Sequence, residues 1–278
     1  MAALLMIGCG RLSFESMQAG AGEDAATALD ATPSDGDGRP ADGDLGGCVP
    51  STPHDEDSDL RADDCDPCPL RADDGADVDA DGVGDACDPW PATPERIILF
   101  DPFVGQRPEW VVEGAFEFRT DEIRMDGRTS AASGRLLPAP GREVLEFTGR
   151  GRNADAGDHA AALEIGAASG LARYGCEVGV VSGAARLAFT STLDQITYTT
   201  IAAMPMATTL ASNEVRLTLE LTPPNVRCEV VMMGELATVS GIVPGGFPAE
   251  VVRLTARGVE VEVDGFVRAG ETAGAQQP

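Results

Sequence analysis

Aspartate and cysteine recur at a fixed spacing in the first third of the chain, and this repeat restricts the fold more than any other feature. The segment DEDSDLRADDCD at 55–66 aligns with DVDADGVGDACD at 77–88, so that Asp55 falls on Asp77 and Cys65 on Cys87. Five aspartates and one cysteine agree between the two copies. So many carboxylates repel one another and cannot enter an apolar core. The segment therefore either binds cations or remains a solvated acidic linker.

Negative charge is concentrated in the same part of the chain. The 278 residues carry a net charge of -26, and residues 23–88 contain 21 acidic residues against 3 arginines. This excess argues against nucleic acid binding, which depends on cations that meet phosphates. An acidic globular protein, or one that binds divalent cations, fits the composition better.

The spacing of the aspartates suits calcium, which takes about six to eight hard oxygen ligands in loose geometry. Loop positions 1, 3, 5, 7, 9 and 12 supply such ligands, with position 7 giving its backbone carbonyl. In the second copy, these positions are Asp77, Asp79, Asp81, Val83, Asp85 and Asp88. In the first copy, they are Asp55, Asp57, Asp59, Arg61, Asp63 and Asp66. Position 6 is Gly82 in the second copy but Leu60 in the first, so we expect the second loop to bind calcium more tightly.

The stretch CDPCPLRADDGADVDADGVGDACDP closely resembles the thrombospondin type 3 repeat, and the resemblance covers residues 48–90. It implies little regular secondary structure, a chain wrapped around calcium ions, and disulfides that link neighbouring repeats. It also implies that Cys48 pairs with Cys65 and Cys68 with Cys87, although the sequence alone leaves three pairings open. The spacing of Cys65 and Cys68 occurs in zinc and thioredoxin sites as well, but the hard oxygens around it favour calcium.

Export is indicated by the cysteines. Six of the seven could form three disulfides, which persist outside the cytoplasm; they are Cys48, Cys65, Cys68, Cys87, Cys176 and Cys228. The N-terminal MAALLMIGCGRL resembles a bacterial lipoprotein signal, which implies lipidation of Cys9; a spare N-terminal thiol is the alternative. No run approaches the ~20 apolar residues of a membrane-spanning helix. We expect a lipoprotein of the outer membrane or cell surface, or a secreted protein.

Residues after about 95 predict an antiparallel β-sandwich of the jelly-roll type. Short runs of alternating apolar residues follow one another with Gly, Pro, Asn or Asp between most of them, and no run keeps a helical period. The predicted organisation is a lipoprotein signal at 1–9, a disordered tether at 10–47, calcium-binding repeats at 48–94, a sandwich at 95–270 and a disordered tail at 271–278.

Several stretches of this region resemble concanavalin A-like and laminin G-like sandwiches. LFDPF at 99–103 and Trp110 precede GAFEFRTDEIRM at 114–125, which is similar to the opening hairpin of that fold. The stretch at 226–232 resembles the strand that ends in a turn before the late strands, and 251–269 resembles the last strand pair, with a turn at Arg257-Gly258. Cys176 and Cys228 are expected to form a disulfide across strands.

A catalytic role has few candidate residues. Glu262 and Asp264 begin the carboxylate pattern of some glucanases of this fold, but no second Glu completes it. The alternation of Glu260, Glu262 and Asp264 with valines instead predicts the solvent-exposed, wet face of an edge or last strand. His159 falls in a predicted loop without a nucleophile partner. We therefore predict a non-enzymatic calcium-binding surface protein with a structural or adhesive role, whose sandwich binds carbohydrate or a surface partner. The alternatives are a secreted glycan-active hydrolase or lyase, and a sandwich that binds nothing.

Overall fold

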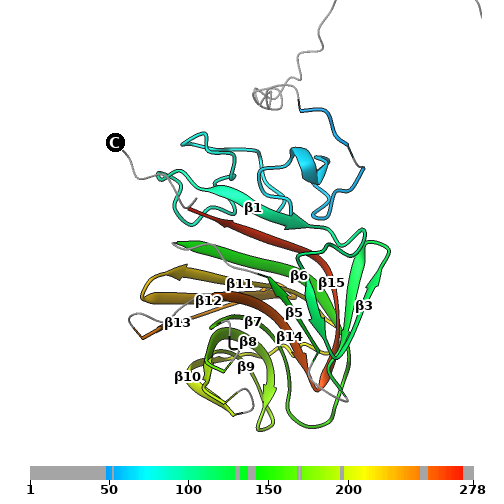
Figure 1. Cartoon of the computed structure of the whole chain (residues 1–278), viewed down its shortest axis with the longest axis vertical. Helices are drawn as coiled ribbons and strands as arrows, with labels where there is room; N and C mark the ends of the chain where they lie inside the picture. The colour runs from blue at the N-terminus through cyan, green and yellow to red at the C-terminus, as the bar shows by residue number, and fades with distance from the viewer. Residues whose placement is uncertain are drawn as a thin grey trace, which may run out of the picture. The chain divides into compact units, whose positions relative to one another are not determined.

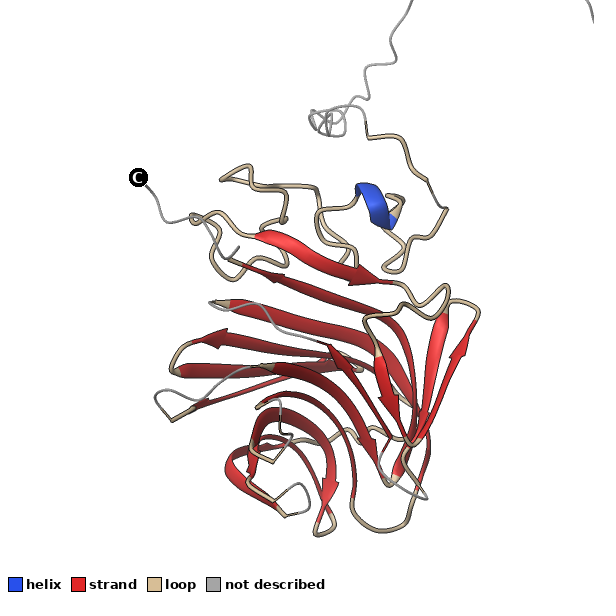
Figure 2. Cartoon of the chain, viewed as in Figure 1, coloured by secondary structure: helices blue, strands red, loops and turns tan. Residues whose placement is uncertain are grey.

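The computed structural model describes residues 48–271, except 52, 129–131, 137–141, 168, 170, 195–196 and 245–249. The predictions for Cys9, the tether at 10–47 and the tail beyond Glu271 lie outside the described residues. Within these residues, the chain is all-β, as the alternating runs predict, with one short 3-10 helix, η1 (Asp63–Cys65) (Figure 2). None of the described residues belongs to a helix with the length and apolarity to span a membrane.

The strands have the following bounds: β1 (Arg96–Asp101), β2 (Val111–Glu113), β3 (Ala115–Arg119), β4 (Glu122–Asp126), β5 (Ala132–Leu136), β6 (Glu143–Ala154), β7 (His159–Gly166), β8 (Arg173–Val181), β9 (Ala184–Thr192), β10 (Tyr198–Pro205), β11 (Glu214–Thr222), β12 (Asn225–Met232), β13 (Glu235–Ile242), β14 (Val251–Arg257) and β15 (Val259–Gly270). The predicted opening hairpin is present as β3 and β4, which pair across the turn at Asp121.

Two antiparallel sheets face each other as a jelly-roll-type sandwich (Figure 1). Sheet A has eight of the described strands, in the order β13-β12-β11-β6-β15-β4-β3, with β1 also paired to β15. Sheet B has seven, in the order β10-β9-β8-β7-β14-β5-β2. Alternating residues of both sheets meet in one core that contains Phe147, Leu163, Leu217 and Leu254, each 0 % exposed. The disulfide between Cys176 on β8 and Cys228 on β12 joins the two sheets through this core.

The last two strands do not pair with each other, which corrects the expectation for 251–269. β14 lies in sheet B between β7 and β5, whereas β15 lies in sheet A beside β6. The chain changes sheets at Gly258, whose φ of +62° suits glycine. A Cβ at that position would lie 2.4 Å from the carbonyl oxygen of Asp158. The predicted turn at Arg257-Gly258 is therefore a corner between sheets.

The repeat segment, residues 48–94, has little regular secondary structure (Figure 2). Disulfides join Cys48 to Cys65 and Cys68 to Cys87, which are the pairings that the resemblance implies. Leu70 is 4 % exposed and packs over Gly265 of β15, where a Cβ would approach it to 2.4 Å. The segment is thus packed on the outer face of sheet A.

Candidate functional site

The second acidic loop is held in shape by two of its own aspartates. The carboxylate of Asp77 accepts hydrogen bonds from the backbone N–H groups of Asp81 at 3.2 Å and Gly82 at 2.9 Å. The carboxylate of Asp85 accepts one from Val78 at 3.0 Å. These bonds connect residues four, five and seven positions apart, so positions 1 and 9 of the loop organise its backbone.

The first acidic loop repeats these bonds at the equivalent positions of its own sequence. Asp55 accepts hydrogen bonds from the backbone of Asp59 at 3.1 Å and Leu60 at 3.0 Å, and Asp63 accepts one from Glu56 at 2.9 Å. The two copies of the sequence repeat therefore fold into the same loop.

The turn at position 6 is also the same, although its residue differs. Gly82 has a φ of +92° and Leu60 has a φ of +81°, and position 4 is left-handed in both loops, at Ala80 and Ser58. The substitution of leucine for glycine therefore leaves the turn in place. The leucine is therefore held in a left-handed backbone conformation, which residues other than glycine rarely adopt.

Carboxylates gather at the inner side of each loop. In the second loop, one oxygen from each of four residues lies within 4.8 Å of the others; the four are Asp79, Asp81, Asp88 and Glu95. The first loop has two such groups that share Asp59; they are Asp55, Asp57 and Asp59, and Asp59, Asp66 and Asp73. Of the residues predicted as ligands, Asp77, Asp85 and Asp63 lie outside these groups. The side chain of Val83 is buried.

Asp73 and Glu95 were missed by the sequence analysis. They occupy equivalent positions of the two copies, and each follows the position 5 aspartate of its loop at the same distance along the chain. The backbone N–H of Asp73 donates to Asp59 at 3.4 Å, and that of Glu95 donates to Asp81. The repeat offset could have identified them, but the conservative change from Asp to Glu and the distance from the loop hide the match.

Arginines partly offset the charge at these two carboxylates. Nη1 of Arg61 lies 2.9 Å from Oδ1 of Asp73, and Nη2 of Arg142 lies 2.8 Å from Oε1 of Glu95. Arg61 stands at position 7 of the first loop, whereas Arg142 comes from the sandwich, just before β6. The carboxylate groups of both loops therefore retain excess negative charge.

Buried carboxylate oxygens without a hydrogen-bond partner among the described residues mark the same positions in both copies. They belong to Asp57 and Asp79, Asp66 and Asp88, and Asp73 and Glu95; Asp63 of the first loop has a further one, without a counterpart at Asp85. Burial raises the pKa of Asp57 to about 6 and those of Asp66 and Glu95 to about 7, and neighbouring aspartates add to each rise. Oxygens that are buried, crowded and unpartnered suit a hard divalent cation, and calcium in particular.

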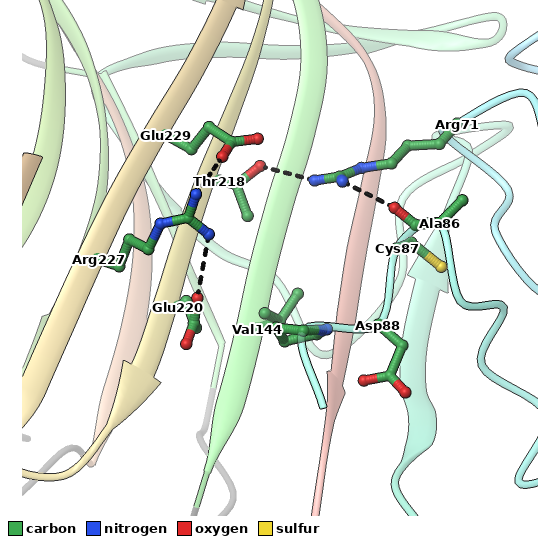
Figure 3. A pocket seen from close by; sticks show the side chains of 10 residues that line it. Arg71, Ala86, Cys87, Asp88, Val144, Thr218, Glu220, Arg227 and Glu229 are labelled. Carbon is green, nitrogen blue, oxygen red and sulfur yellow. Dashed lines mark hydrogen bonds and ion pairs between the residues drawn. The ribbon is translucent and has the colours of Figure 1, made fainter. Parts of the chain in front are cut away.

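Arg71 connects the repeat segment to the sandwich (Figure 3). Its guanidinium forms an ion pair with Glu146 of β6, and also donates to Thr218 of β11 at 3.2 Å and to the carbonyl oxygen of Ala86 at 2.9 Å. Ala86, Cys87 and Asp88 are consecutive residues. One side chain therefore links the end of the second loop to two strands of sheet A.

The carboxylates considered for catalysis are held by arginines. Glu260 is 3 % exposed. Its Oε1 lies 2.6 Å from Nε of Arg124, and its Oε2 lies 3.1 Å from Nη2 of Arg128. Glu262 is 8 % exposed and is paired with Arg152. The segment is the last of the described strands, as one of the two alternatives predicted, but it is not an edge strand and its glutamates are not exposed to solvent. β15 lies between β6 and β4, and long arginine side chains cover the glutamates.

These ion pairs also bear on proton transfer. Burial acts to raise the pKa of Glu260, but hydrogen bonds from Arg124 and Asn153 outweigh it and hold that pKa below its usual value. A carboxyl with a low pKa is a poor general acid at neutral pH. The arrangement favours a structural role for Glu260.

The position of His159 also differs from expectation. It is the first residue of β7 and only 8 % exposed, so the predicted loop is shorter than the sequence suggested. The small residues of the preceding NADAG stretch hid the start of the strand, because they carry no apolar alternation.

No protein-family model and no curated protein sequence matches the chain. Among solved structures, it is similar to the VIP36 exoplasmic/lumenal domain in its Ca2+/Man-bound form, with a TM-score of 0.49 and 8 % identity over 64 % of this chain and 90 % of that one. It is also similar to lectin II from Ulex europaeus, with a TM-score of 0.48 and 12 % identity over 63 % and 99 % of the two chains. The Bacillus licheniformis beta-glucanase gives a TM-score of 0.46 and 8 % identity over 62 % and 97 %. The ligand and activity of this chain are therefore inferred from its own residues.

Proposed function

We propose that the chain is an exported calcium-binding protein in which two thrombospondin type 3-like loops, once loaded with calcium, form a rigid base for the β-sandwich. A single observation carries this proposal. Unpartnered buried carboxylate oxygens occur at three pairs of positions, and the two members of each pair are equivalent in the two copies of the repeat. A chance acidic linker would not place such oxygens at the same positions of both copies.

Calcium is the cation that these donors suit. All of the donors identified in the two loops are carboxylates, with no imidazole or thiolate among them, and hard oxygens favour calcium and magnesium over zinc or copper. Irregular loops with several carboxylates suit calcium better, because magnesium demands near-ideal octahedral geometry. Asp79, Asp81, Asp88 and Glu95 would hold one ion. The groups around Asp59 would hold the ions of the first loop.

The proposed role of the sandwich is recognition of carbohydrate or another surface component, and the proposed setting is the cell surface. Three disulfides support an oxidising compartment. Lipidation of Cys9 would hold the protein at the outer membrane or cell surface, and without it the protein would be secreted. The ion pairs of Glu260 and Glu262 support a binding function over glycan hydrolysis.

Calorimetric titration of calcium into the oxidised, calcium-stripped full chain tests the proposal. We expect saturable heat. The Asp79→Ala/Asp81→Ala variant should lose the tighter sites, and the Asp57→Ala/Asp59→Ala variant should lose the weaker ones. Asp74→Ala is the matched control, because Asp74 is an exposed aspartate of the same segment outside every carboxylate group. Absence of heat, or heat that both double variants retain, would contradict the proposal.

A further inference from the structure

Sheet A ends on one side in β13, which differs from the other edge strands of the sandwich (Figure 1). Among the described residues, β13 pairs only with β12, so its second edge is open. Natural proteins protect open strand edges, because the free N–H and C=O groups there recruit other strands. Common protections are a short strand, charged side chains, a proline or a β-bulge.

The other edge strands carry such protections. β2, at one end of sheet B, is only three residues long. β1 and β10 each have a register shift in the pairing with their one neighbour, and β10 also ends at Pro205. β3, at the far end of sheet A, carries Glu117 and Arg119 among its five residues.

β13 lacks all of these protections. It runs for eight residues, ELATVSGI, in unbroken register with β12 and without proline. Its one charged residue, Glu235, is already engaged, because its carboxylate accepts hydrogen bonds from the backbone N–H groups of Ala207 and Thr208, both at 2.9 Å. Two of its side chains are large, apolar and exposed: Leu236 is 63 % exposed and Ile242 is 65 % exposed. An edge of this kind suits pairing with another strand.

The open edge presents a defined set of backbone groups. A two-residue turn at Met233 and Gly234 joins β12 to β13, and both φ values are positive, at +51° and +78°, as in a type I′ hairpin. In such hairpins the two residues beside the turn, here Met232 and Glu235, exchange both hydrogen bonds. Alternation along the strand then directs the N–H and C=O groups of the even-numbered residues of 236–242 to the open edge.

The same even-numbered positions carry the outward-facing side chains, and these are arranged symmetrically about Val239. Leu236 precedes Val239 by three residues, and Ile242 follows it by three. When two β13 strands pair antiparallel and centred on Val239, Leu236 of one copy lies opposite Ile242 of the other, and this contact occurs twice. Thr238 lies opposite Ser240 in the same way. Because directly opposite side chains contact each other, the pairing buries both exposed apolar side chains.

Charges on the neighbouring strand also match in this register. On β12, Glu229 lies beside Thr238, and Arg227 lies beside Ser240. The antiparallel pairing therefore places Glu229 of one copy in the same row as Arg227 of the other. Only the short side chains of Thr238 and Ser240 lie between them. Residues 236–242 are uncharged, so the seam brings no like charges directly opposite each other, which would be destabilising.

We infer that two copies of this chain dimerise through β13, with the two strands antiparallel and centred on Val239, so that the two A sheets become one continuous sheet. Each pair of even-numbered residues exchanges two hydrogen bonds across the seam. A two-fold axis relates the copies, which makes the contact self-complementary and closed. The inference goes beyond the proposed calcium binding and uses none of the proposed calcium ligands.

The length of the seam sets the expected affinity. Eight residues at ~3.4 Å each give a shared edge of ~27 Å. Such a contact lies at the small end of specific interfaces, so we expect a dissociation constant in the micromolar range.

Mass measurement of the oxidised full chain in calcium tests the inference, by light scattering or sedimentation equilibrium from ~1 to ~500 μM. We expect the mass of one chain at the lowest concentrations and of two at the highest. Leu236→Lys/Ile242→Lys should keep the mass of one chain throughout, because lysines would face each other twice. Leu236→Lys/Ile242→Glu should restore the dimer, since each lysine then meets a glutamate of the other copy. Within one chain the two positions are ~20 Å apart, so only pairing between copies explains such a restoration.

The controls separate dimerisation from folding. Both substituted positions are exposed, and unchanged circular dichroism would verify that the variants fold. Val104→Lys is the matched control, because Val104 is an exposed apolar residue outside the described strands, and this variant should dimerise as the wild type does.

Several outcomes would overturn the inference. A monomer at every concentration would do so, and would leave the β13 edge to an extended segment of a different protein. A dimer that persists in Leu236→Lys/Ile242→Lys, or that does not return in Leu236→Lys/Ile242→Glu, would also overturn it. So would assemblies larger than two, because a closed two-fold contact does not form them.

Discussion

Nε of Arg71 lies 3.1 and 3.0 Å from the two carboxylate oxygens of Glu146. Arg71 belongs to the repeat segment, and Glu146 is a residue of β6 that is 1 % exposed. The ion pair is therefore made where little water can screen it. It fixes the orientation of an irregular segment that has few backbone bonds of its own to the sheet.

We expect Arg71→Ala to lower the free energy of unfolding by about 3–5 kcal/mol, because Glu146 would remain buried without a cation. Urea unfolding in calcium measures the loss. The Arg71→Met/Glu146→Gln double variant should recover much of it, because it removes both charges. A loss in the double variant as large as that in Arg71→Ala would show that packing, and not charge, holds the segment.

The left-handed turn of the first loop predicts a gain of function. Leu60→Gly should tighten calcium binding at the first loop by about fivefold to thirtyfold, since a non-glycine residue at such a φ costs roughly 1–2 kcal/mol. Gly82→Ala should weaken the second loop by a similar factor. A Cβ at Gly82 meets no atom within 4 Å, so an effect of Gly82→Ala comes from the backbone conformation and not from a steric clash. Calorimetry measures both, and unchanged affinity in both would rule out strain at position 6.

Asp264 predicts a pH dependence of stability. Burial raises its pKa from 3.8 to about 6, and the nearby Glu122 adds to the rise. Between these values, the folded protein keeps a proton that the unfolded chain releases. Stability from this group is therefore complete below pH ~4, falls as pH rises to ~6, and stays low above that.

Asp264→Asn should accordingly raise the free energy of unfolding at pH 8, by at most about 3 kcal/mol, and leave it unchanged near pH 4. Urea unfolding at the two pH values tests this. Asp121→Asn in the exposed β3–β4 turn is the control, because asparagine tolerates the positive φ of that position. An equal effect of Asp264→Asn at both pH values would contradict the assignment.

The disulfide between the sheets should contribute about 4 kcal/mol, because it closes 52 residues of chain. The Cys176→Ala/Cys228→Ala variant should therefore unfold at lower denaturant concentration and keep its calcium heat. Loss of calcium binding in that variant would show that the loops depend on the integrity of the whole sandwich.

The alternation of apolar residues predicts most of the strands, because each β-residue faces either the core or solvent. It does not tell which sheet a strand joins, so β14 and β15 were expected to pair although Gly258 sends them to different sheets. Burial of Glu260 and Glu262 was also missed, since arginines far apart in sequence cover them.

The aspartate repeat predicts the two loops and most of their inward carboxylates. Asp73 and Glu95 escaped because the loop template ends at position 12, well before either of them in the sequence.

The two disulfides of the repeat segment also set the route by which tension would travel. Cys48 is bonded to Cys65 and Cys68 to Cys87, and only Asp66 and Pro67 separate the two bridges. A pull applied at residue 48 would pass through one bridge, Asp66 and Pro67, and then the other bridge before it reached the sandwich. Residues 49–64 and 69–86, which contain most of both acidic loops, are bypassed and would carry no load. Mechanical force on an anchored molecule would therefore act directly on Asp66, Asp88 and Glu95 and spare the other carboxylates of the two loops.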